Sequence, residues 1–507
     1  MNIQSSKIGS LINRIRVERG LTQVEFAKRL GTSQSAVNRI EKGKQNLSMD
    51  MLARISDVLK SQIVQLNSDS LSLRIVGGHH LSGEIETKAS KNGSMGLLAA
   101  SLLNKGTTKL KHVPKIEEVF RIIEVFESIG VSVKWVNGSD LEIKPPKTFD
   151  MDNIDHAAAR RTRSVIMMIG SLMHSLRAFD LPYAGGCKLG KRTISPYFYA
   201  LEEFGVNIDT KDTHYEITVG RKKPEQIVMY EPGDTVTETA IMAAACLPQT
   251  TTLRKVSANY AVQDLCLYLR KLGVKIDGIG TSTLVITGIK GPAKKNVSYT
   301  VSEDPIESMF FLTAGIVTNS SITITRCPIE FLELELLKLE KMGAKFQIGE
   351  RYKADNGFTD LVDIKTLKHS GLTALPDKIH ALPYPGINMD NLPFFVPIAA
   401  LAKGRTLIHD WTYENRAVYY TELSKLGAIV ELADVHRVYI TGPTTFKAAE
   451  MICPPALRPG AVILIAMLAA QGTSILRNIY TINRGYEDLA QRLNSLGAKI
   501  EVISDIG

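Results

Sequence analysis

EDLAQRLNSLGAKIEV, residues 487–502, contains the pattern that decides the fold. Glu487–Ser495 has the spacing of an amphipathic helix, Leu496-Gly497-Ala498 ends that helix, and Lys499–Val502 alternates charged and apolar residues as a short strand does. The step from an apolar residue through glycine to valine or alanine occurs five more times, at Ile129-Gly130-Val131, Phe204-Gly205-Val206, Leu272-Gly273-Val274, Met342-Gly343-Ala344 and Leu426-Gly427-Ala428. Six copies of one structural unit are therefore expected.

A second, more apolar helix is predicted upstream of each glycine step. These segments are Met95–Leu103, Val165–Met173, Ala240–Cys246, Ser308–Val317, Phe394–Ala402 and Ala461–Ala470. A helix that is apolar on all sides must be buried, so strands are expected to surround it. The unit reads helix, strand, helix, strand, strand, and its repetition predicts an α/β protein.

Each of these buried helices begins near a polar or charged residue. The residues are Asn92, Arg163, Glu238, Asp304, Asp390 and Arg458. If three such helices run parallel in each half of the repeat region, their free backbone N–H groups and their dipoles make one face attractive to anions. Two halves that face each other would enclose a cleft, where ligand sites concentrate.

The segment Tyr183–Arg192, YAGGCKLGKR, has the composition of a loop. Its three glycines allow backbone conformations that other residues avoid. Cys187 lies beside three cations, Lys188, Lys191 and Arg192, which would stabilise a reactive thiolate. Taken by itself, the segment is more simply explained as a basic surface loop with an incidental cysteine.

Composition limits the class of protein. A chain of 507 residues is too long for one core, so two or three domains are expected. The five cysteines are scattered and the ten histidines lack ligand spacing, so we expect no disulfide framework, no metal site and no cofactor. An apolar leader and a transmembrane run are both missing from the sequence, which favours a cytoplasmic protein without a membrane partner.

Positive charge is concentrated at the N-terminus. The chain carries a formal net charge of +9, and residues 1–60 hold eleven Lys or Arg against five Asp or Glu. Thr22-Gln23-Val24-Glu25 is a capping box that opens one helix, and Ser33 caps a second helix after Gly31. Two short helices around a turn with glycine, on a basic segment, predict an all-α helix-turn-helix domain over residues 1–62, followed by a linker over residues 63–72.

The segment LTQVEFAKRLGTSQSAVNRIEKGK, residues 21–44, resembles the Cro/repressor family of helix-turn-helix domains. The resemblance implies that double-stranded DNA is a partner and that the major groove faces Gln34, Ser35, Asn38 and Arg39. Such domains usually read DNA as dimers, so a homodimer is also expected. The alternative is a small helical bundle used for dimerisation or for contact with a protein.

From residue 73 onward the chain resembles the enolpyruvyl transferases, and among them the UDP-N-acetylglucosamine enolpyruvyl transferase family. The matching residues, in chain order, are Lys91-Asn92, Arg163, Cys187, Arg192, Asp390 after Pro383–Gly386, Arg416 in Glu414-Asn415-Arg416, Arg458 and Arg484. The resemblance implies a two-lobed inside-out α/β barrel of six repeats. Residues 91–300 would form one lobe with the cysteine loop, and residues 73–90 plus 301–507 the other.

The resemblance also implies the chemistry. Enolpyruvyl would pass from phosphoenolpyruvate to the 3-hydroxyl of UDP-N-acetylglucosamine, releasing phosphate, which is the first committed step of peptidoglycan precursor synthesis. Cys187, Asp390 and Lys91 would be catalytic, with Asp390 as the base and Cys187 as the acid that protonates C3. Substrate would be bound by Asn92, Arg163, Arg192, Glu238, Asp304, Arg416, Arg458 and Arg484.

The chain departs from the family pattern at positions that the resemblance assigns to the nucleotide part of the acceptor. Arg192-Thr193-Ile194-Ser195 replaces Arg-Pro-x-Asp, Gly233–Thr239 replaces Ser-Val-Gly-Ala-Thr-Glu-Asn, and Ala456 and Asn483 replace aspartates. Three interpretations therefore stay open. The chain is a UDP-N-acetylglucosamine enolpyruvyl transferase, an enolpyruvyl transferase with another nucleotide or sugar acceptor, or a ligand-sensing transcription regulator built on an inactive transferase fold.

Overall fold

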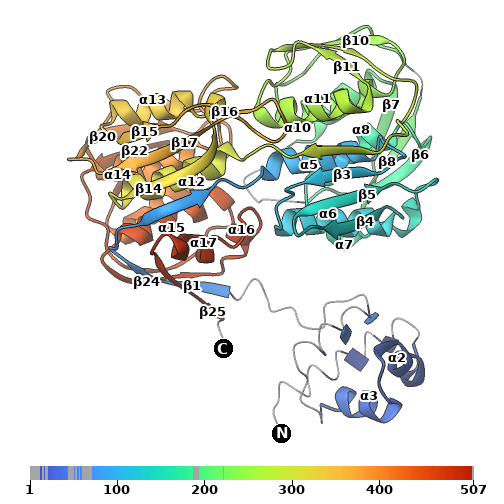
Figure 1. Cartoon of the computed structure of the whole chain (residues 1–507), viewed down its shortest axis with the longest axis horizontal. Coiled ribbons are helices and arrows are strands. Elements are labelled where there is room, and N and C mark those ends of the chain that lie inside the picture. Colours follow the sequence, from blue (N-terminus) through green and yellow to red (C-terminus); the bar gives the residue numbers. More distant parts are fainter. Residues whose placement is uncertain are drawn as a thin grey trace. The chain divides into compact units, whose positions relative to one another are not determined.

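The computed structural model describes residues 21–43, 71–185, 193–220 and 222–504, together with residues 9, 12, 13, 16, 17, 51, 54, 55, 58 and 59. The chain divides into two compact units, residues 1–71 with 504–507 and residues 72–503 (Figure 1). Within the described ranges, every helix is too short or too polar to cross a lipid bilayer.

The N-terminal unit contains the two predicted helices of the helix-turn-helix, α2 (Gln23–Leu30) and α3 (Gln34–Glu41). The capping box at Thr22 forms as expected, since the Thr22 and Glu25 side chains each accept a hydrogen bond from the backbone of the other. Gly31 ends α2 with a left-handed φ of 66°, and Ser33 caps α3. A small apolar core that includes Phe26, Leu30 and Val37 holds the helices together.

The first three repeats lie between residues 91 and 300. In chain order their elements are α5 (Lys91–Ser101), β3 (Thr108–Lys111), α6 (Glu117–Ser128), β4 (Ser132–Val136), β5 (Asp140–Lys144), η2 (Met151–Asn153), α7 (His156–Ala159), η3 (Ser164–Met167), α8 (Met168–Leu172), β6 (Ala178–Pro182), α9 (Ser195–Glu202), β7 (Val206–Thr210), β8 (His214–Val219), β9 (Gln226–Val228), α10 (Asp234–Ala245), β10 (Thr250–Arg254), α11 (Tyr260–Leu272), β11 (Lys275–Asp277), β12 (Thr283–Thr287) and β13 (Val297–Thr300). We call this part the first lobe.

The second lobe contains the remaining repeats and two strands from before residue 90. Its elements are β1 (Leu71–Gly77), β2 (Ser82–Glu86), α12 (Pro305–Val317), β14 (Ser321–Pro328), η4 (Ile329–Phe331), α13 (Glu333–Lys341), β15 (Lys345–Ile348), β16 (Tyr352–Lys353), β17 (Asp360–Leu367), β18 (Leu372–Thr373), β19 (Ile379–His380), η5 (Leu392–Phe394), α14 (Phe395–Leu401), β20 (Ala402–His409), η6 (Ala417–Leu426), β21 (Ile429–Asp434), β22 (Arg437–Gly442), β23 (Glu450–Ile452), α15 (Leu457–Ala469), β24 (Gly472–Arg477), α16 (Tyr480–Asn483), α17 (Leu489–Ser495) and β25 (Lys499–Ser504).

The strands of the described residues form three sheets in each lobe. The first lobe has the orders β13-β3-β5-β4, β6-β8-β7 and β11-β12-β10-β9, and the second lobe has β23-β24-β1-β25, β15-β17-β14-β2 and β18-β20-β22-β21. β1 pairs with β24 and β2 with β14, so the segment before residue 90 lies in the sheets of the second lobe. The two segments that connect the lobes are joined by a β-bridge between Ala89 and Glu303.

The six glycine steps all occupy the same structural position. Gly130, Gly205, Gly273, Gly343, Gly427 and Gly497 have positive φ between 84° and 105°. A side chain with a Cβ atom is disfavoured there, and glycine therefore ends each outer helix and turns the chain into the next strand. The prediction of six repeats is confirmed.

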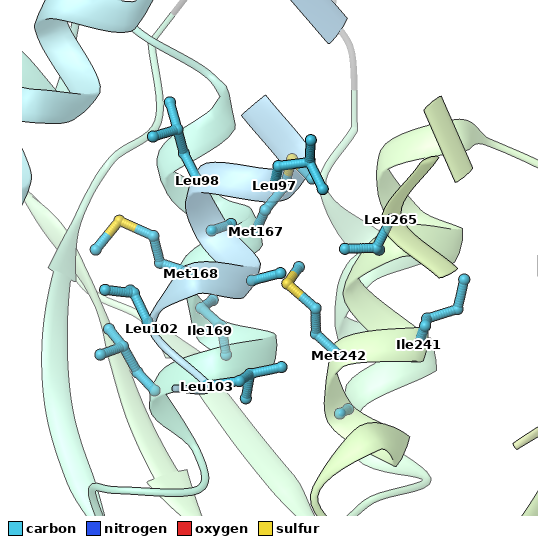
Figure 2. Packing of buried hydrophobic residues seen from close by; sticks show 14 of the residues in the cluster. Leu97, Leu98, Leu102, Leu103, Met167, Met168, Ile169, Ile241, Met242 and Leu265 are labelled. Atoms are coloured by element: carbon cyan, nitrogen blue, oxygen red, sulfur yellow. The ribbon is translucent and has the colours of Figure 1, made fainter. Parts of the chain in front are cut away.

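The buried helices pack against one another inside each lobe. In the first lobe α5, α8 and α10 are in mutual contact, and in the second lobe α12, α14 and α15 are. Figure 2 shows Met242 of α10 between α10 and α5, and Leu98 of α5 and Met168 of α8 belong to the same apolar cluster. Helices inside and sheets outside give the predicted two-lobed α/β architecture, and the N-terminal ends of the inner helices carry the candidate site.

Candidate active site and nucleic-acid interface

Glu118 of α6 connects cations from both lobes. Its Oε2 accepts a hydrogen bond of 2.8 Å from Nη2 of Arg484 in the second lobe, and it lies 3.7 Å from Nζ of Lys91, the first residue of α5. Its Oε1 accepts a hydrogen bond from the Thr162 hydroxyl. One buried carboxylate therefore holds the predicted catalytic Lys91 and the predicted substrate-binding Arg484 together across the lobe junction.

The charge of Glu118 is stabilised in spite of its burial. Burial by itself raises the pKa of this carboxyl, but Lys91 and Arg484 lower it more, so the pKa lies below its usual value. Glu118 is not among the catalytic or substrate-binding residues predicted from the sequence. Its neighbour Glu117 is chemically the same and forms a local ion pair with Arg121, so nothing in the sequence separates the two glutamates.

Asn92, the next residue of α5, contacts a buried tyrosine. Its Nδ2 donates a hydrogen bond of 3.1 Å to the hydroxyl of Tyr260 at the start of α11. The Tyr260 ring packs edge-on against Phe331 of the second lobe, with centroids 5.7 Å apart. Burial and the nearby Asp304 raise the pKa of Tyr260 well above its usual value, so the phenol remains neutral and polar at the lobe junction.

Asp304 caps α12, where the chain enters the second lobe. Its Oδ1 accepts a hydrogen bond of 2.9 Å from the backbone N–H of Ile306. Burial raises the pKa of Asp304 from its usual value of 3.8 to about 6, although Arg458 acts in the opposite direction. This carboxylate is therefore more costly to ionise in the folded protein than in the unfolded chain.

The raised pKa of Asp304 makes a testable contribution to stability. Between about pH 4 and pH 6 the unfolded chain loses this proton first, so the unfolding free energy should fall as the pH rises. A shift of about two pH units corresponds to about 3 kcal/mol at neutral pH. We expect Asp304→Asn to remove this part of the pH dependence in urea unfolding at pH 4, 5, 6 and 7. An unchanged pH profile would contradict the expectation.

Asp390 lies between two guanidinium groups. Its Oδ2 is 3.3 Å from Nη2 of Arg458, and its Oδ1 is 3.5 Å from Nη1 of Arg416. Arg458 lies in the first turn of α15 and also donates a hydrogen bond of 2.9 Å to the Tyr486 hydroxyl. These contacts orient the Asp390 carboxylate at the lobe junction.

Arg416 is fully buried and is held mainly by another residue, Asp410. Its Nη2 donates a hydrogen bond of 2.8 Å to Oδ1 of Asp410 and one of 2.6 Å to the backbone carbonyl of Met389, and its Nε donates to the second Asp410 oxygen. The Tyr420 hydroxyl also donates to Asp410. Arg416 thus fixes the chain next to Asp390.

Loss of the Arg416 side chain is expected to destabilise the protein. Arg416→Met would leave the buried Asp410 carboxylate without its cation, which typically costs about 3–5 kcal/mol. The unfolding free energy in urea should fall by this amount. Arg405→Met, which removes an exposed ion pair with Glu431, is the matched control and should change it by less than about 1 kcal/mol. Equal losses in both variants would contradict this role of Arg416.

Two further predicted residues lie in the first lobe. Arg163, at the start of η3, donates a hydrogen bond of 2.9 Å to the carbonyl of Thr193, where the chain leaves the cysteine loop. Glu238, in the second turn of α10, is buried against Gly96 of α5, and its Oε1 has no hydrogen-bond partner among the described residues. Burial and the neighbouring Asp234 raise its pKa well above the usual value.

Cys187 and Arg192 lie outside the described residues. Contacts of Glu118, Tyr260 and Asp390 hold five of the other predicted residues, namely Lys91, Asn92, Arg416, Arg458 and Arg484. Arg163, Glu238 and Asp304 are not joined to them by these contacts.

A cavity of about 340 Å³ lies between the lobes. Its walls include Asp234, Ser257 and Asn259 of the first lobe. The second lobe contributes Phe331, Glu335, Tyr384, Asn388 and Met389, among others. Met389 immediately precedes the candidate base Asp390 in the chain, so the cavity wall includes the neighbour of that residue.

The second helix of the helix-turn-helix presents polar side chains to solvent. Gln34, Ser35 and Arg39 of α3 are exposed, and Asn38 is partly buried. Gln34 Nε2 donates a hydrogen bond of 2.7 Å to Oε1 of Gln23 at the start of α2. This geometry leaves one face of α3 open for an external partner.

Comparison with known proteins agrees with both units. Residues 75–493 match the EPSP synthase (3-phosphoshikimate 1-carboxyvinyltransferase) family, and residues 12–66 match the helix-turn-helix family. Proteins named UDP-N-acetylglucosamine 1-carboxyvinyltransferase from Treponema denticola and Campylobacter jejuni are each 32% identical to the chain, over 431 and 428 residues. Each alignment covers 84% of this chain and 98% of the relative.

The fold is shared with a solved structure of the enolpyruvyl transferase NikO from Streptomyces tendae. The TM-score is 0.75 at 24% sequence identity, and the match covers 86% of this chain and 99% of the other. The chain therefore belongs to the EPSP synthase family of enolpyruvyl transferases and carries a helix-turn-helix domain at its N-terminus.

Proposed function

We propose that the larger unit transfers enolpyruvyl from phosphoenolpyruvate to a hydroxyl group of an acceptor and releases phosphate. The observation that carries the proposal is the contact of Lys91 and Arg484, from different lobes, with the single carboxylate of Glu118. Phosphoenolpyruvate carries a phosphate and a carboxylate, and Lys and Arg side chains bind both groups with charge-assisted hydrogen bonds. Closure of the lobes would complete this donor site.

The transfer proceeds by addition and elimination. Asp390 takes the proton of the acceptor hydroxyl as its oxygen bonds to C2 of the donor, while Cys187 gives a proton to C3. A tetrahedral ketal results. C3 then loses a proton and the bond from C2 to the phosphate oxygen breaks, which yields the enol ether and phosphate. Arg458 and Arg416 hold Asp390 in position, while Lys91, Arg163, Arg192 and Arg484 bind the donor.

Two acceptors are candidates. The names of the curated relatives support UDP-N-acetylglucosamine, which would place the chain at the first committed step of peptidoglycan precursor synthesis. The cavity between the lobes supports a different acceptor, because Asp234 and Glu335 contribute carboxylates to its wall. Either acceptor is consistent with the same donor chemistry.

Phosphate release tests the transfer directly. We expect the full-length protein to release phosphate from phosphoenolpyruvate in the presence of a suitable hydroxyl acceptor, and Cys187→Ala to lose this activity. A panel of nucleotide sugars and amino sugars identifies the acceptor. Absence of release with every acceptor, together with DNA binding that depends on one of these ligands, would instead support a transcription regulator on an inactive transferase fold.

We further propose that the N-terminal unit binds double-stranded DNA through α3, as a homodimer. The support is the exposed polar face of α3 and the excess of positive charge over residues 1–60. Guanidinium and amide groups on such a helix match base edges and phosphates in the major groove.

Arg39→Ala is expected to weaken DNA binding. Loss of one phosphate or base contact should reduce affinity by about tenfold or more, since such contacts contribute about 1–3 kcal/mol. Fluorescence anisotropy with a genomic fragment library, read at several salt concentrations, provides the measurement. Affinity that does not change with salt, or that is the same in wild type and Arg39→Ala, would count against this role of α3.

A further inference from the structure

The cavity of about 340 Å³ between the lobes has an acidic lining. Its lining residues include Asp234, Glu330, Glu333 and Glu335, and none of the described residues in its wall is lysine, arginine or histidine. A diphosphate placed here would meet several carboxylates with no positive side chain in the described wall to offset them. Like charges brought together in a partly dehydrated site are strongly unfavourable.

Asp234 occupies the position where an anion would otherwise bind. It is the first residue of α10, and an uncovered helix N-terminus attracts phosphate. Its carboxylate is held in place by the Ser257 hydroxyl and by Nδ2 of Asn259, the latter at 2.8 Å. Burial raises the pKa of Asp234, and the charge of Asp390 contributes to the same direction of shift.

Glu335 provides a second, independent indication of the ligand. This residue of α13 is only 2% exposed and lines the cavity. Its Oε1 accepts hydrogen bonds from the backbone N–H of Asn388 and from Nδ2 of Asn391, while no side chain of the described residues donates to Oε2. Oε2 can therefore accept a hydrogen bond from a group bound in the cavity.

We infer that the acceptor places an amino-bearing, hydroxylated group, of the amino-sugar class, in this cavity, and that Asp234 excludes nucleoside diphosphates from it. This inference rests on the proposed transferase function. An ammonium group would lie against Asp234 and Glu335, and hydroxyl groups would donate to the remaining carboxylate oxygens. The rings of Phe331 and Tyr384, with centroids 5.3 Å apart, offer an apolar wall for the face of a sugar ring.

The test uses two probes of opposite charge on the full-length protein. Calorimetry measures the affinities of UDP and of D-glucosamine for the wild type, Asp234→Asn, Asp234→Ser and the exposed control Glu431→Gln. Removal of the Asp234 charge should strengthen UDP binding and weaken glucosamine binding, each by about tenfold. Glu431→Gln should change neither.

Opposite changes of the two affinities in both Asp234 variants support the inference. Any other result overturns it, including UDP binding that is equal or weaker in the variants. Phosphoenolpyruvate affinity, measured in the same samples, separates this inference from the proposed function. If the wild type does not bind phosphoenolpyruvate, the transferase proposal fails whatever the two probes show.

Discussion

Asp390→Asn is expected to lower kcat for phosphate release by about 10²- to 10⁴-fold, the usual contribution of a positioned general base. Asparagine keeps the size of the side chain and one acceptor oxygen for Arg458 or Arg416, but it cannot take the proton of the acceptor hydroxyl. Binding of phosphoenolpyruvate should change little, because its proposed ligands Lys91 and Arg484 are contacted by Glu118 and not by Asp390.

The matched control for this variant is Asp434→Asn. Asp434 is the last residue of β21, where it pairs with Arg437, and it is absent from the contacts of the candidate site. Single-turnover phosphate release should slow only in Asp390→Asn. If the rate of Asp390→Asn stays within about threefold of the wild type, another group acts as the base.

Arg484→Met is expected to lower kcat/KM for phosphoenolpyruvate by about 10²- to 10³-fold. Truncating one partner of a buried, hydrogen-bonded charge pair typically costs about 2–5 kcal/mol, and the donor would lose the same cation. Steady-state phosphate release at varied phosphoenolpyruvate provides the measurement. The loss should appear mainly in KM for the donor, since Arg484 is proposed to bind and not to transfer protons.

Arg405→Met serves again as the control, because its ion pair with Glu431 lies on the surface. It should leave kcat/KM for phosphoenolpyruvate within about twofold of the wild type. Equal KM values for the donor in Arg484→Met and the wild type would remove Arg484 from the donor site.

The fold could be predicted because its signal is repeated. Each glycine step must adopt a left-handed backbone at the end of an outer helix, and Gly130 in the first repeat and Gly497 in the last both do so. A local requirement of this kind is visible in the sequence without knowledge of remote contacts. The capping box at Thr22 is readable for the same reason.

The candidate site was less predictable, since its contacts join residues far apart in the chain. Glu118 and Arg484 are separated by 366 positions, and only the packing of the two lobes brings them together. Asp234 was visible as a departure from the family pattern, but its place in an acidic cavity wall depends on Glu335 of the other lobe. No spacing rule connects such residues.

Arg416 was expected to bind substrate, but its contacts in the structure are with residues of the protein. The resemblance implies that Arg416 binds substrate, whereas its guanidinium is hydrogen-bonded to Asp410 and Met389 and lies 3.5 Å from Asp390. We therefore propose that it acts by positioning Asp390. Its buried counterion, Asp410, lies six residues earlier in the chain, and no sequence motif predicts this ion pair.

A crystal structure of the full-length protein with phosphoenolpyruvate tests the central claim most directly. We predict that the donor binds between the lobes, with Lys91 from α5 and Arg484 from the second lobe both within hydrogen-bonding distance of its anionic groups. Donor bound elsewhere, or bound with only one of these two cations in reach, would contradict the account.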